Sequence, residues 1–549
     1  MGAGVPRGVP RTDGSLRSDR GFDAVVGNPP YIRIQKLGRE LATWCRARFP
    51  VAFGSFDAYI VFIERAAGLL GPEGRLGFIV PNKFLKLESG KKLREALAAG
   101  ALVEEIVDFG DAQLFEGATN YTCVLVLDAS GQDQLGYRKV RGAAPGVPLA
   151  REIQGSALEP FEVGGLGGSP WVLVSGTERQ LLNQLSADTV PLGDLCGSIF
   201  TGLQTSADPV YIVEDRGSRT DGRLVYSKAS DRELLLEPDL LHPLASGTEV
   251  ARYAFEPLND LLLFPYQRQD GEMELLPPDG LARLPLTAAY LGEHEEALRG
   301  RERGKMDHDG WHAFGRNQGL GLHSLPKLGV AATVPRLEVA ADLAGEIYFH
   351  NVRVNGILAG DDGPGLTVLL AMLNSRLLDW VFKLGAPPHA NGYFAANKQF
   401  IAPLPIRHPT ADVASLLDSA GGRLHGATAE LLAERVGFRK WLGEVIGVPM
   451  RSLPGHSKLG EPDLLTLTEI ASIVSSSRVS LEVDPDSRSF RERLAAEHVN
   501  SVEKASDLQR AIAVDEGVVN DAIYDLYEVT ESQRAMVEGR TWRPKRGRR

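Results

Sequence analysis

The apolar positions of the first 130 residues fall into short runs that alternate between strand-like and helix-like spacing. Runs rich in β-branched residues end at glycine, proline or aspartate, whereas the segments between them repeat apolar residues every three or four positions. The first predicted strand ends at Val26, and the others cover residues 76–80, 103–109 and 122–127. The predicted helices cover 56–70 and 89–99. This alternation is typical of a doubly wound α/β domain, in which we expect the run 124–127 to be a hairpin or edge element.

The pattern changes beyond residue 130. Glycine and proline become frequent, then short strands and many turns follow, and the last part of the chain is mainly helical and amphipathic. We therefore predict a disordered N-terminus at 1–20, a catalytic α/β part at 21–130, a linker at 131–190, an α+β domain at 191–406, a helical region at 411–535 and a basic tail at 536–549.

One stretch combines strand and turn signals with unusual chemistry. The run Phe22–Gly27 leads directly into Asn28, Pro29, Pro30 and Tyr31. Each proline fixes φ and donates no N–H, so the Pro29 carbonyl has a fixed direction beside the Asn28 side-chain oxygen. Two acceptors next to an aromatic ring suit an aromatic amine, because they can bind its hydrogens and direct its lone pair towards an electrophile.

Two simpler interpretations of this stretch remain open. Asn-Pro-Pro is an ordinary turn sequence, and Pro-Pro-Tyr occurs in polyproline ligands. A ligand of that kind is expected in a polar, disordered segment, whereas Asn28 follows a strand. The stretch resembles the catalytic motif of amino-methylating DNA methyltransferases of the adenine-N6 kind. That resemblance implies that Asn28 and Pro29 bind the adenine amino group and that Tyr31 covers the base.

The resemblance extends over residues 22–127. The segment beginning Phe56-Asp57-Ala58-Tyr59 looks like the motif that follows the catalytic loop, and 74–81 looks like the next strand. By this resemblance Phe62 packs on the cofactor, S-adenosylmethionine, and Phe115 stacks on a flipped adenine opposite Tyr31.

The family's cofactor-binding motif is not found. In the gamma motif order, a glycine-rich turn precedes the catalytic motif by many tens of residues, and an acidic residue binds the ribose. Neither is present before Asn28. We therefore expect the chain to need a separate chain or a preceding segment for its cofactor site, and to be inactive alone.

Residues 191–406 resemble a TaqI-like specificity domain. The similar segments include 199–205, 311–316, 373–375, 392–394 and 403–406. A target-recognition domain needs polar and basic side chains on loops that reach double-stranded DNA. The basic residues that we select are Arg316, Lys327, Arg336, Lys383 and Lys398, for which the alternative is solvated surface charge.

Composition limits these interpretations without deciding them. The formal net charge is −11, although the first 150 residues hold 19 basic against 16 acidic residues, so DNA binding requires a local basic surface. The three cysteines are far apart, which suits a reducing cytoplasm, and we find no signal peptide or membrane span. Asp307, His308, Asp309 and His312 form a polar loop, and we predict no metal site.

Together these features predict an adenine-specific DNA methyltransferase of a restriction-modification or related defence system. The α/β part carries catalysis and the α+β part recognises DNA. The alternatives are a DNA-binding specificity subunit, and a truncated restriction endonuclease-methyltransferase that is inactive without its N-terminal part.

Overall fold

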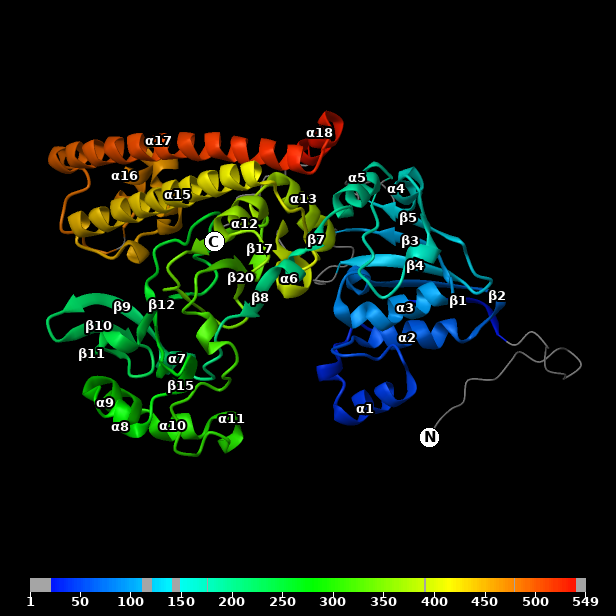
Figure 1. Ribbon diagram of the computed structural model, residues 1–549, viewed down its shortest axis with the longest axis horizontal. Helices are drawn as coiled ribbons and strands as arrows, with labels where there is room; N and C mark the ends of the chain where they lie inside the picture. Colours follow the sequence, from blue (N-terminus) through cyan, green and yellow to red (C-terminus); the bar gives the residue numbers. More distant parts are fainter. Residues whose placement is uncertain are drawn as a thin grey trace, which may run out of the picture. The chain divides into compact units, whose positions relative to one another are not determined.

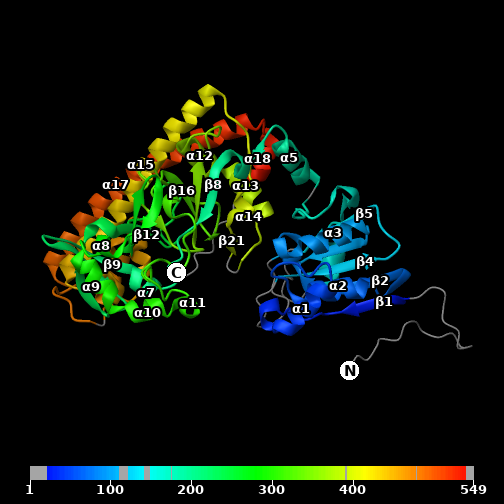
Figure 2. The same cartoon turned by 60° about the horizontal axis from the view of Figure 1, so that its bottom comes forward.

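The computed structural model describes residues 21–110, 121–140, 149–174, 176–389, 392–477 and 479–539. The chain forms two compact units (Figures 1 and 2). The first unit contains residues 1–184 together with 383–394, and the second contains 185–382 and 395–549. The second segment of the first unit is therefore supplied by a part of the chain about 200 residues downstream.

A six-stranded mixed sheet forms the centre of the first unit. Its strands are β1 (Phe22–Gly27), β2 (Leu70–Pro81), β3 (Val103–Asp108), β4 (Thr122–Asp128), β5 (Gln134–Lys139) and β6 (Glu159–Glu162), in the order β1-β2-β4-β3-β5-β6. Strands β1 and β2 are parallel, as are β3 and β5, while β4 is antiparallel to both of its neighbours. Because β2 and β3 are both antiparallel to β4, they are parallel in direction to each other. Strands β1, β2, β3 and β5 therefore all point the same way.

Helices lie between the strands of this sheet along the chain or follow them. They are α1 (Arg39–Arg48), α2 (Ala58–Ala67), α3 (Lys91–Ala99), α4 (Leu149–Gly155) and α5 (Gly176–Ser186). Tyr59 and Ile63 of α2 and Leu93 and Leu97 of α3 are buried in one hydrophobic core with the inward residues of the strands. The helical spacing seen in the sequence at 56–70 and 89–99 therefore places the apolar side chains on the sheet, as expected for an α/β layer.

The structure corrects two sequence expectations. Strand β4 lies inside the sheet, between β2 and β3, and not at an edge; its alternating residues Cys123, Leu125 and Leu127 are all buried. The region 131–190, expected to be a linker, adds β5 and β6 to the sheet. Glycines such as Gly136 made this region resemble a loop, but alternate residues, including Tyr137, enter the core.

Buried Arg94 connects α3 to two loops. Its guanidinium donates to the carbonyls of Phe84 (2.5 Å), Leu87 (2.8 Å), Gly168 (2.6 Å) and Ser169 (2.9 Å). A single planar cation thus binds four backbone acceptors together, one of which, the Leu87 carbonyl, also accepts from the Gly90 N–H (3.0 Å). Arg94 thus fixes the turn after β2 against the loop that follows β6.

The second unit contains two larger sheets. The first has the order β11-β10-β9-β13-β12-β19 and the second β18-β16-β20-β8. Their strands are β8 (Cys196–Thr201), β9 (Ile212–Arg219), β10 (Gly222–Ser227), β11 (Arg232–Leu236), β12 (Leu241–Ala245), β13 (Asp260–Leu263), β16 (Lys327–Ala331), β18 (Val339–Asp342), β19 (Tyr348–Phe349) and β20 (Val354–Ala359). The remaining described strands form two-stranded sheets. These are the hairpin of β14 (Tyr266–Gln269) and β15 (Glu272–Leu275), the pair of β7 (Val190–Pro191) and β22 (Pro405–Ile406), and the pair of β17 (Thr333–Val334) and β21 (Phe394–Ala395).

Short helices connect these strands, and two long helices follow them along the chain. The short ones include α8 (Pro278–Leu281), α9 (Pro285–Glu293), α12 (Leu366–Leu373) and α13 (Arg376–Gly385). The long helices α15 (Ala411–Ile446) and α17 (Arg488–Leu526) lie side by side, and α16 (Leu467–Ser475) and α18 (Glu531–Gly539) are shorter (Figure 1). Ion pairs Arg423–Asp515 (2.6 Å) and Lys504–Glu434 (3.3 Å) show that α15 and α17 run antiparallel.

The helices at 411–539 belong to the same compact unit as the strands at 191–406. Tyr527 donates its hydroxyl proton to the Pro405 carbonyl (2.7 Å), and Asn520 accepts from the Arg376 backbone N–H (2.8 Å). In the described parts of the chain, no helix has both the length and the apolar content that crossing a membrane requires.

We expect Arg94→Met to lower the stability of the first unit by about 3 kcal/mol, because four backbone carbonyls lose the donor that the buried guanidinium supplies. Hydrogen-exchange mass spectrometry of peptides from β2 to β4 would measure this loss as faster exchange. Arg65→Met is the matched control, because Arg65 is exposed on α2 and has no described partner. Equal exchange in the two variants would contradict a structural role for Arg94.

Candidate active site

The carboxyl ends of β1, β2, β3 and β5 lie at one edge of the first sheet. The registers Gly27↔Phe78 and Asp108↔Lys139 align the ends of the two parallel pairs. In open α/β sheets, this edge is where ligands bind, because the loops that leave the strands converge there. The loop carrying Asn28 is one of these.

Asn28 and Pro29 follow β1 directly. The Asn28 side chain is exposed, and no described residue forms a hydrogen bond with its amide. Pro29 is buried, and no described donor reaches its carbonyl. Two adjacent acceptors at a strand end thus have no hydrogen-bond donor among the described residues, and their use by a ligand stays a prediction.

The ring of Tyr31 is held in a fixed position. Its hydroxyl donates to the Ile79 carbonyl of β2 (2.9 Å), one residue beyond the last pairing of β1 with β2. The ring also packs edge-to-face on Tyr59, with centroids 6.3 Å apart. Burial, followed by the nearby Cys123, raises the pKa of Tyr31, so the hydroxyl keeps the proton that it donates. Tyr31 therefore orients the loop that contains Asn28.

The following segment pairs with the start of α2. The Ile34 N–H donates to the Phe56 carbonyl (3.0 Å), and the Ala58 N–H donates to the Ile32 carbonyl (2.8 Å). This pairing places buried Asp57 beside the loop, where it forms an ion pair with Lys83 in the 3₁₀ turn after β2. The loops after β1 and β2 are thus connected by backbone pairing and by a charge pair.

Asp108 connects the next strand ends. Its carboxylate accepts from the Asn82 side chain (2.8 Å), the Gly110 N–H (3.0 Å) and the Tyr137 hydroxyl (2.9 Å). Asn82 comes directly after β2, and Tyr137 is on β5. Burial, followed by the charge of Asp108, raises the pKa of Tyr137, so this hydroxyl remains a donor. The network fixes three strand ends relative to one another.

Lys86 binds the downstream segment of the first unit. Its ammonium donates to the carbonyls of Leu384 (2.7 Å) and Ala386 (3.0 Å). Burial and the positive charge of Lys139 lower the pKa of Lys86 to about 8, although Asp108 opposes the shift. This lysine thus attaches residues 383–394 to the turn after β2.

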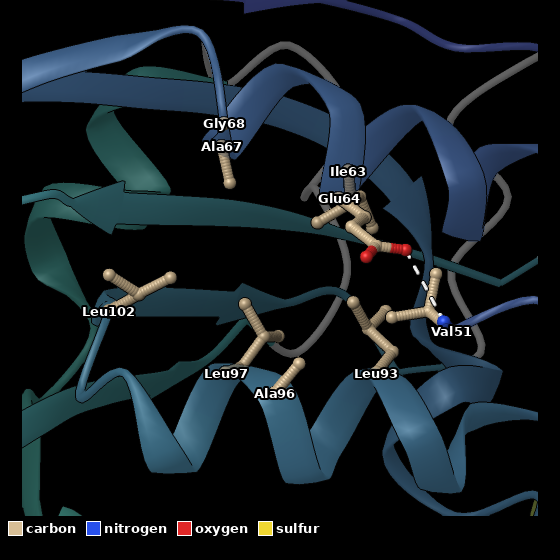
Figure 3. A pocket seen from close by; sticks show the side chains of 9 residues that line it. All are labelled: Val51, Ile63, Glu64, Ala67, Gly68, Leu93, Ala96, Leu97 and Leu102. Carbon is tan, nitrogen blue, oxygen red and sulfur yellow. Dashed lines mark hydrogen bonds between the residues drawn. The ribbon is translucent and has the colours of Figure 1, made fainter. Parts of the chain in front are cut away.

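A separate cavity of about 260 Å³ lies between α2 and α3 (Figure 3). Its walls are apolar except for Glu64, whose carboxylate accepts from the Val51 N–H (3.3 Å). Burial raises the pKa of Glu64. None of the polar residues of the sheet edge lines this cavity, so it is a gap in the helical layer and not part of the candidate site.

Of the two other aromatic residues predicted for the site, Phe62 lies within the described residues and Phe115 does not. Phe62 lies on the outer side of α2 and is 48% exposed. It has no aromatic contact among the described residues, so its role in cofactor binding stays a prediction. Phe115 lies outside the described residues.

The described residues do not provide a complete site for S-adenosylmethionine. Strand β1 is at the edge of the sheet, and no described strand pairs with its outer side. Val26 on this strand is 84% exposed and Phe22 is 39% exposed. A ligand of this size needs walls on several sides, whereas the described residues leave the side beyond β1 open.

The structure separates the five basic residues predicted to contact DNA. Arg316 and Lys398 are exposed, and Arg336 is exposed but forms an ion pair with Glu338 (3.2 Å). Lys383 is half-buried in the segment that joins the first unit. No described contact links these four residues into one surface, so their DNA contacts stay predictions.

The prediction for Lys327 is wrong. This residue is 0% exposed, and its ammonium forms an ion pair with Asp342 while donating to the His323 carbonyl (2.6 Å). Asp342 also accepts from the N–H groups of Gly345 (3.0 Å) and Ile347 (2.9 Å). The pair therefore holds the β18–β19 turn, and the lysine cannot reach a phosphate.

Sequence reasoning missed Asn82, Asp108 and Tyr137. Each lies at or near the end of a strand, which is the only sequence signal they carry. Their association depends on the order of strands in the sheet, which the sequence did not give. Among the described residues there is no cluster of three potential metal ligands, and His308 accepts from the Gly310 N–H (3.0 Å) within its own loop.

Comparison with known proteins adds independent evidence. Residues 9–115 match the family model of the Eco57I restriction-modification methylase. The type II restriction enzyme and methyltransferase RM.Eco57I of Escherichia coli is 27% identical over 319 residues, which are 54% of this chain and 31% of that protein. The adenine-specific methyltransferase PglX of Streptomyces coelicolor is 25% identical over 489 residues, covering 77% of this chain and 37% of its own length.

The chain thus spans about a third of the length of these two relatives. Among solved structures, the type IIL restriction-modification enzyme MmeI in complex with DNA superposes with a TM-score of 0.49 and 11% identity, over 93% of this chain and 57% of that one. The sequence comparisons show that residues 9–115 match the Eco57I restriction-modification methylase family and that the chain is related to restriction-modification methyltransferases.

Proposed function

We propose that the chain carries the catalytic loop and DNA-recognition region of an adenine-N6 DNA methyltransferase. The observation that carries this proposal is the pair of acceptors at Asn28 and Pro29, at the carboxyl end of β1, for which no described residue supplies a donor. The matched family and the related restriction-modification methyltransferases support DNA methylation as the reaction class.

The chemistry follows from this geometry. An adenine amino group donates its two hydrogens to the Asn28 side-chain oxygen and the Pro29 carbonyl. These bonds localise the nitrogen lone pair, and they strengthen as the nitrogen gains positive charge, so they stabilise the transition state more than the ground state. Tyr31 contributes by holding the loop through Ile79 and by offering a ring face to an extruded base. S-adenosylmethionine supplies the electrophilic methyl group when it is bound.

The second unit is the proposed DNA-recognition region. The support is the presence of exposed basic residues such as Arg316 and Lys398 on a strand-rich body, together with the sequence resemblance over 191–406. Since the chain has a net charge of −11, such residues must act locally. Proposed partners are double-stranded DNA and a further polypeptide segment that completes the cofactor site beside β1.

We expect Asn28→Ala to lower the methylation rate at least about 100-fold, because one of the two transition-state hydrogen bonds is lost. The chain would be expressed together with its neighbouring coding sequence, and N6-methyladenine in the host genome would be mapped by single-molecule sequencing. Asn183→Ala is the control, because Asn183 is an exposed asparagine on α5 of the same unit. Modified cytosine in place of adenine, or unchanged methylation in Asn28→Ala, would contradict the proposal.

The open side of β1 predicts weak cofactor binding by the chain alone. One wall of contacts cannot offset the cost of ordering a flexible ligand, so we expect a Kd no tighter than about 1 mM for S-adenosylmethionine. Isothermal titration of the purified chain measures this directly. Micromolar binding would show that the 549 residues form a complete pocket, and the proposed further segment would be unnecessary.

Arg316→Ala should weaken binding to duplex DNA and reduce the slope of log affinity against log salt by about 1, because one phosphate contact is lost. Fluorescence anisotropy at several salt concentrations gives both quantities. Arg488→Ala removes an exposed arginine from α17 and should change neither. If the two variants have equal slopes, Arg316 does not contact phosphate.

A further inference from the structure

The second unit contains a cavity of about 450 Å³ that no proposed step uses. It lies beside β12 and β19, which pair in parallel at Leu244↔Tyr348, and the hairpin β14–β15 and helix α8 also contribute to its lining. This volume is within the range of pockets that bind small organic groups. The residues that line the cavity indicate which class of small organic group it can bind.

Aromatic rings form part of the lining, together with the aliphatic side chains of Leu240, Met273, Leu276 and Leu284. His242 of β12 lies nearly parallel to Tyr348 of β19, with centroids 4.2 Å apart and planes inclined by 24°. Phe264 contacts both rings edge-on, at 5.7 Å from His242 and 4.9 Å from Tyr348. Phe264 and Tyr348 are buried in the core, whereas His242 is half-buried. The three rings hold one another in place, and an aromatic lining of this kind suits a planar aromatic ligand.

The polar groups of Tyr266 and Arg268 are already fixed by the protein. The Tyr266 hydroxyl donates to the Asn317 side chain (3.0 Å) and accepts from the Phe314 N–H (2.7 Å). The Arg268 guanidinium donates to the Gly271 carbonyl (2.8 Å) and to the Ser324 hydroxyl (2.9 Å). Both side chains therefore keep their positions in the absence of a ligand, which is the preorganisation that a binding site needs.

His242 is available to a ligand. Neither ring nitrogen forms a hydrogen bond with a described residue, and neither is sealed from solvent. Burial lowers the pKa of His242 to about 4, so the ring is neutral at pH 7 and offers one donor and one acceptor. Such a ring can both stack on a heteroaromatic ligand and hydrogen-bond to its edge.

The mouth of the cavity is polar and contains two cations. Arg268, Arg283 and Gln267 are exposed there, together with Asp239. Arg283 has no described partner, so its guanidinium is free to bind an anion. Two arginines against one carboxylate favour an anionic group at the mouth, above the aromatic walls. A flat heteroaromatic ring joined to an anion is the structure of a nucleotide.

We propose that this cavity binds an unpaired nucleobase of a DNA strand, with the adjoining phosphate at Arg283. This inference rests on the proposed function for its choice of DNA as the source of the nucleotide. The same chemistry is present in a free nucleotide, and the experiment separates these two sources. The cavity belongs to the second unit, so it is distinct from the Asn28 loop, and its occupant is a second extruded or single-stranded base.

The test uses the full chain and fluorescein-labelled single-stranded 12-mers, because their bases are already unpaired. Four homopolymers of dA, dC, dG and dT are compared with an abasic 12-mer of equal charge by fluorescence anisotropy. We expect the base-containing strands to bind about tenfold more tightly, and His242→Ala to remove that advantage while leaving abasic binding unchanged. His242→Phe keeps a flat ring and should restore most of the affinity.

Arg283→Ala should weaken all five oligonucleotides equally, because it removes a phosphate contact. His308→Ala, an exposed histidine of the same unit, is the control and should have no effect. Equal binding of abasic and base-containing strands, or no effect of His242→Ala on the difference between them, would overturn the proposal. Titration of deoxynucleoside monophosphates tests whether the ligand is a free nucleotide. If the monophosphates bind as tightly as the 12-mers, the cavity binds a free nucleotide and not a base of a DNA strand.

This assay needs neither cofactor nor methyl transfer. A chain that shows no methylation in the Asn28 experiment but binds bases through His242 would disprove the proposed reaction and leave the pocket assignment intact. A chain that methylates adenine but binds abasic and base-containing strands with equal affinity would disprove the pocket assignment and leave the proposed reaction intact.

Discussion

The carboxylate of Asp108 is the contact on which the candidate active site depends. It accepts from Asn82 after β2, from the Gly110 backbone and from Tyr137 on β5, so one buried group joins the ends of three strands. A buried carboxylate is costly unless its lone pairs are filled, and here three donors fill them. Because Asn82 begins the turn that also contains Lys83, this anchor extends through the Lys83–Asp57 pair to the segment that follows Asn28. The loop that contains Asn28 is thus positioned by contacts from neighbouring loops.

The sequence predicted the local parts of this arrangement and missed the parts that depend on strand order. Asn28-Pro29-Pro30-Tyr31 could be singled out because its proposed chemistry lies in four consecutive residues after an apolar run. The role of Asp108 could not, since Asn82 is 26 positions before it and Tyr137 is 29 positions after it. The same reason explains why β4 was expected at an edge. Its apolar run indicated a strand, but nothing in the run showed that two strands would pair with it.

Basic residues show a second limit of sequence reasoning. Lys327 resembles a surface lysine in sequence, yet it is buried against Asp342, which lies 15 positions away on the neighbouring strand β18. Arg94 and Arg301 are likewise buried, and each donates to several backbone carbonyls. A count of lysines and arginines therefore overstates the charge available for DNA, because part of it satisfies backbone groups inside the protein.

This internal use of cations bears on how a chain with a net charge of −11 can bind DNA. Non-specific affinity rises with the number of phosphates neutralised, so a protein with few free cations must obtain more of its affinity from other contacts. Stacking on aromatic side chains is one such source, since it contributes about 1–3 kcal/mol per base and does not depend on charge. The second unit has rigid aromatic walls at His242, Phe264 and Tyr348, with Arg283 free at the mouth. The pocket that we propose would, in such an acidic protein, add base stacking beside the Arg283 guanidinium to the binding energy that surface charge provides.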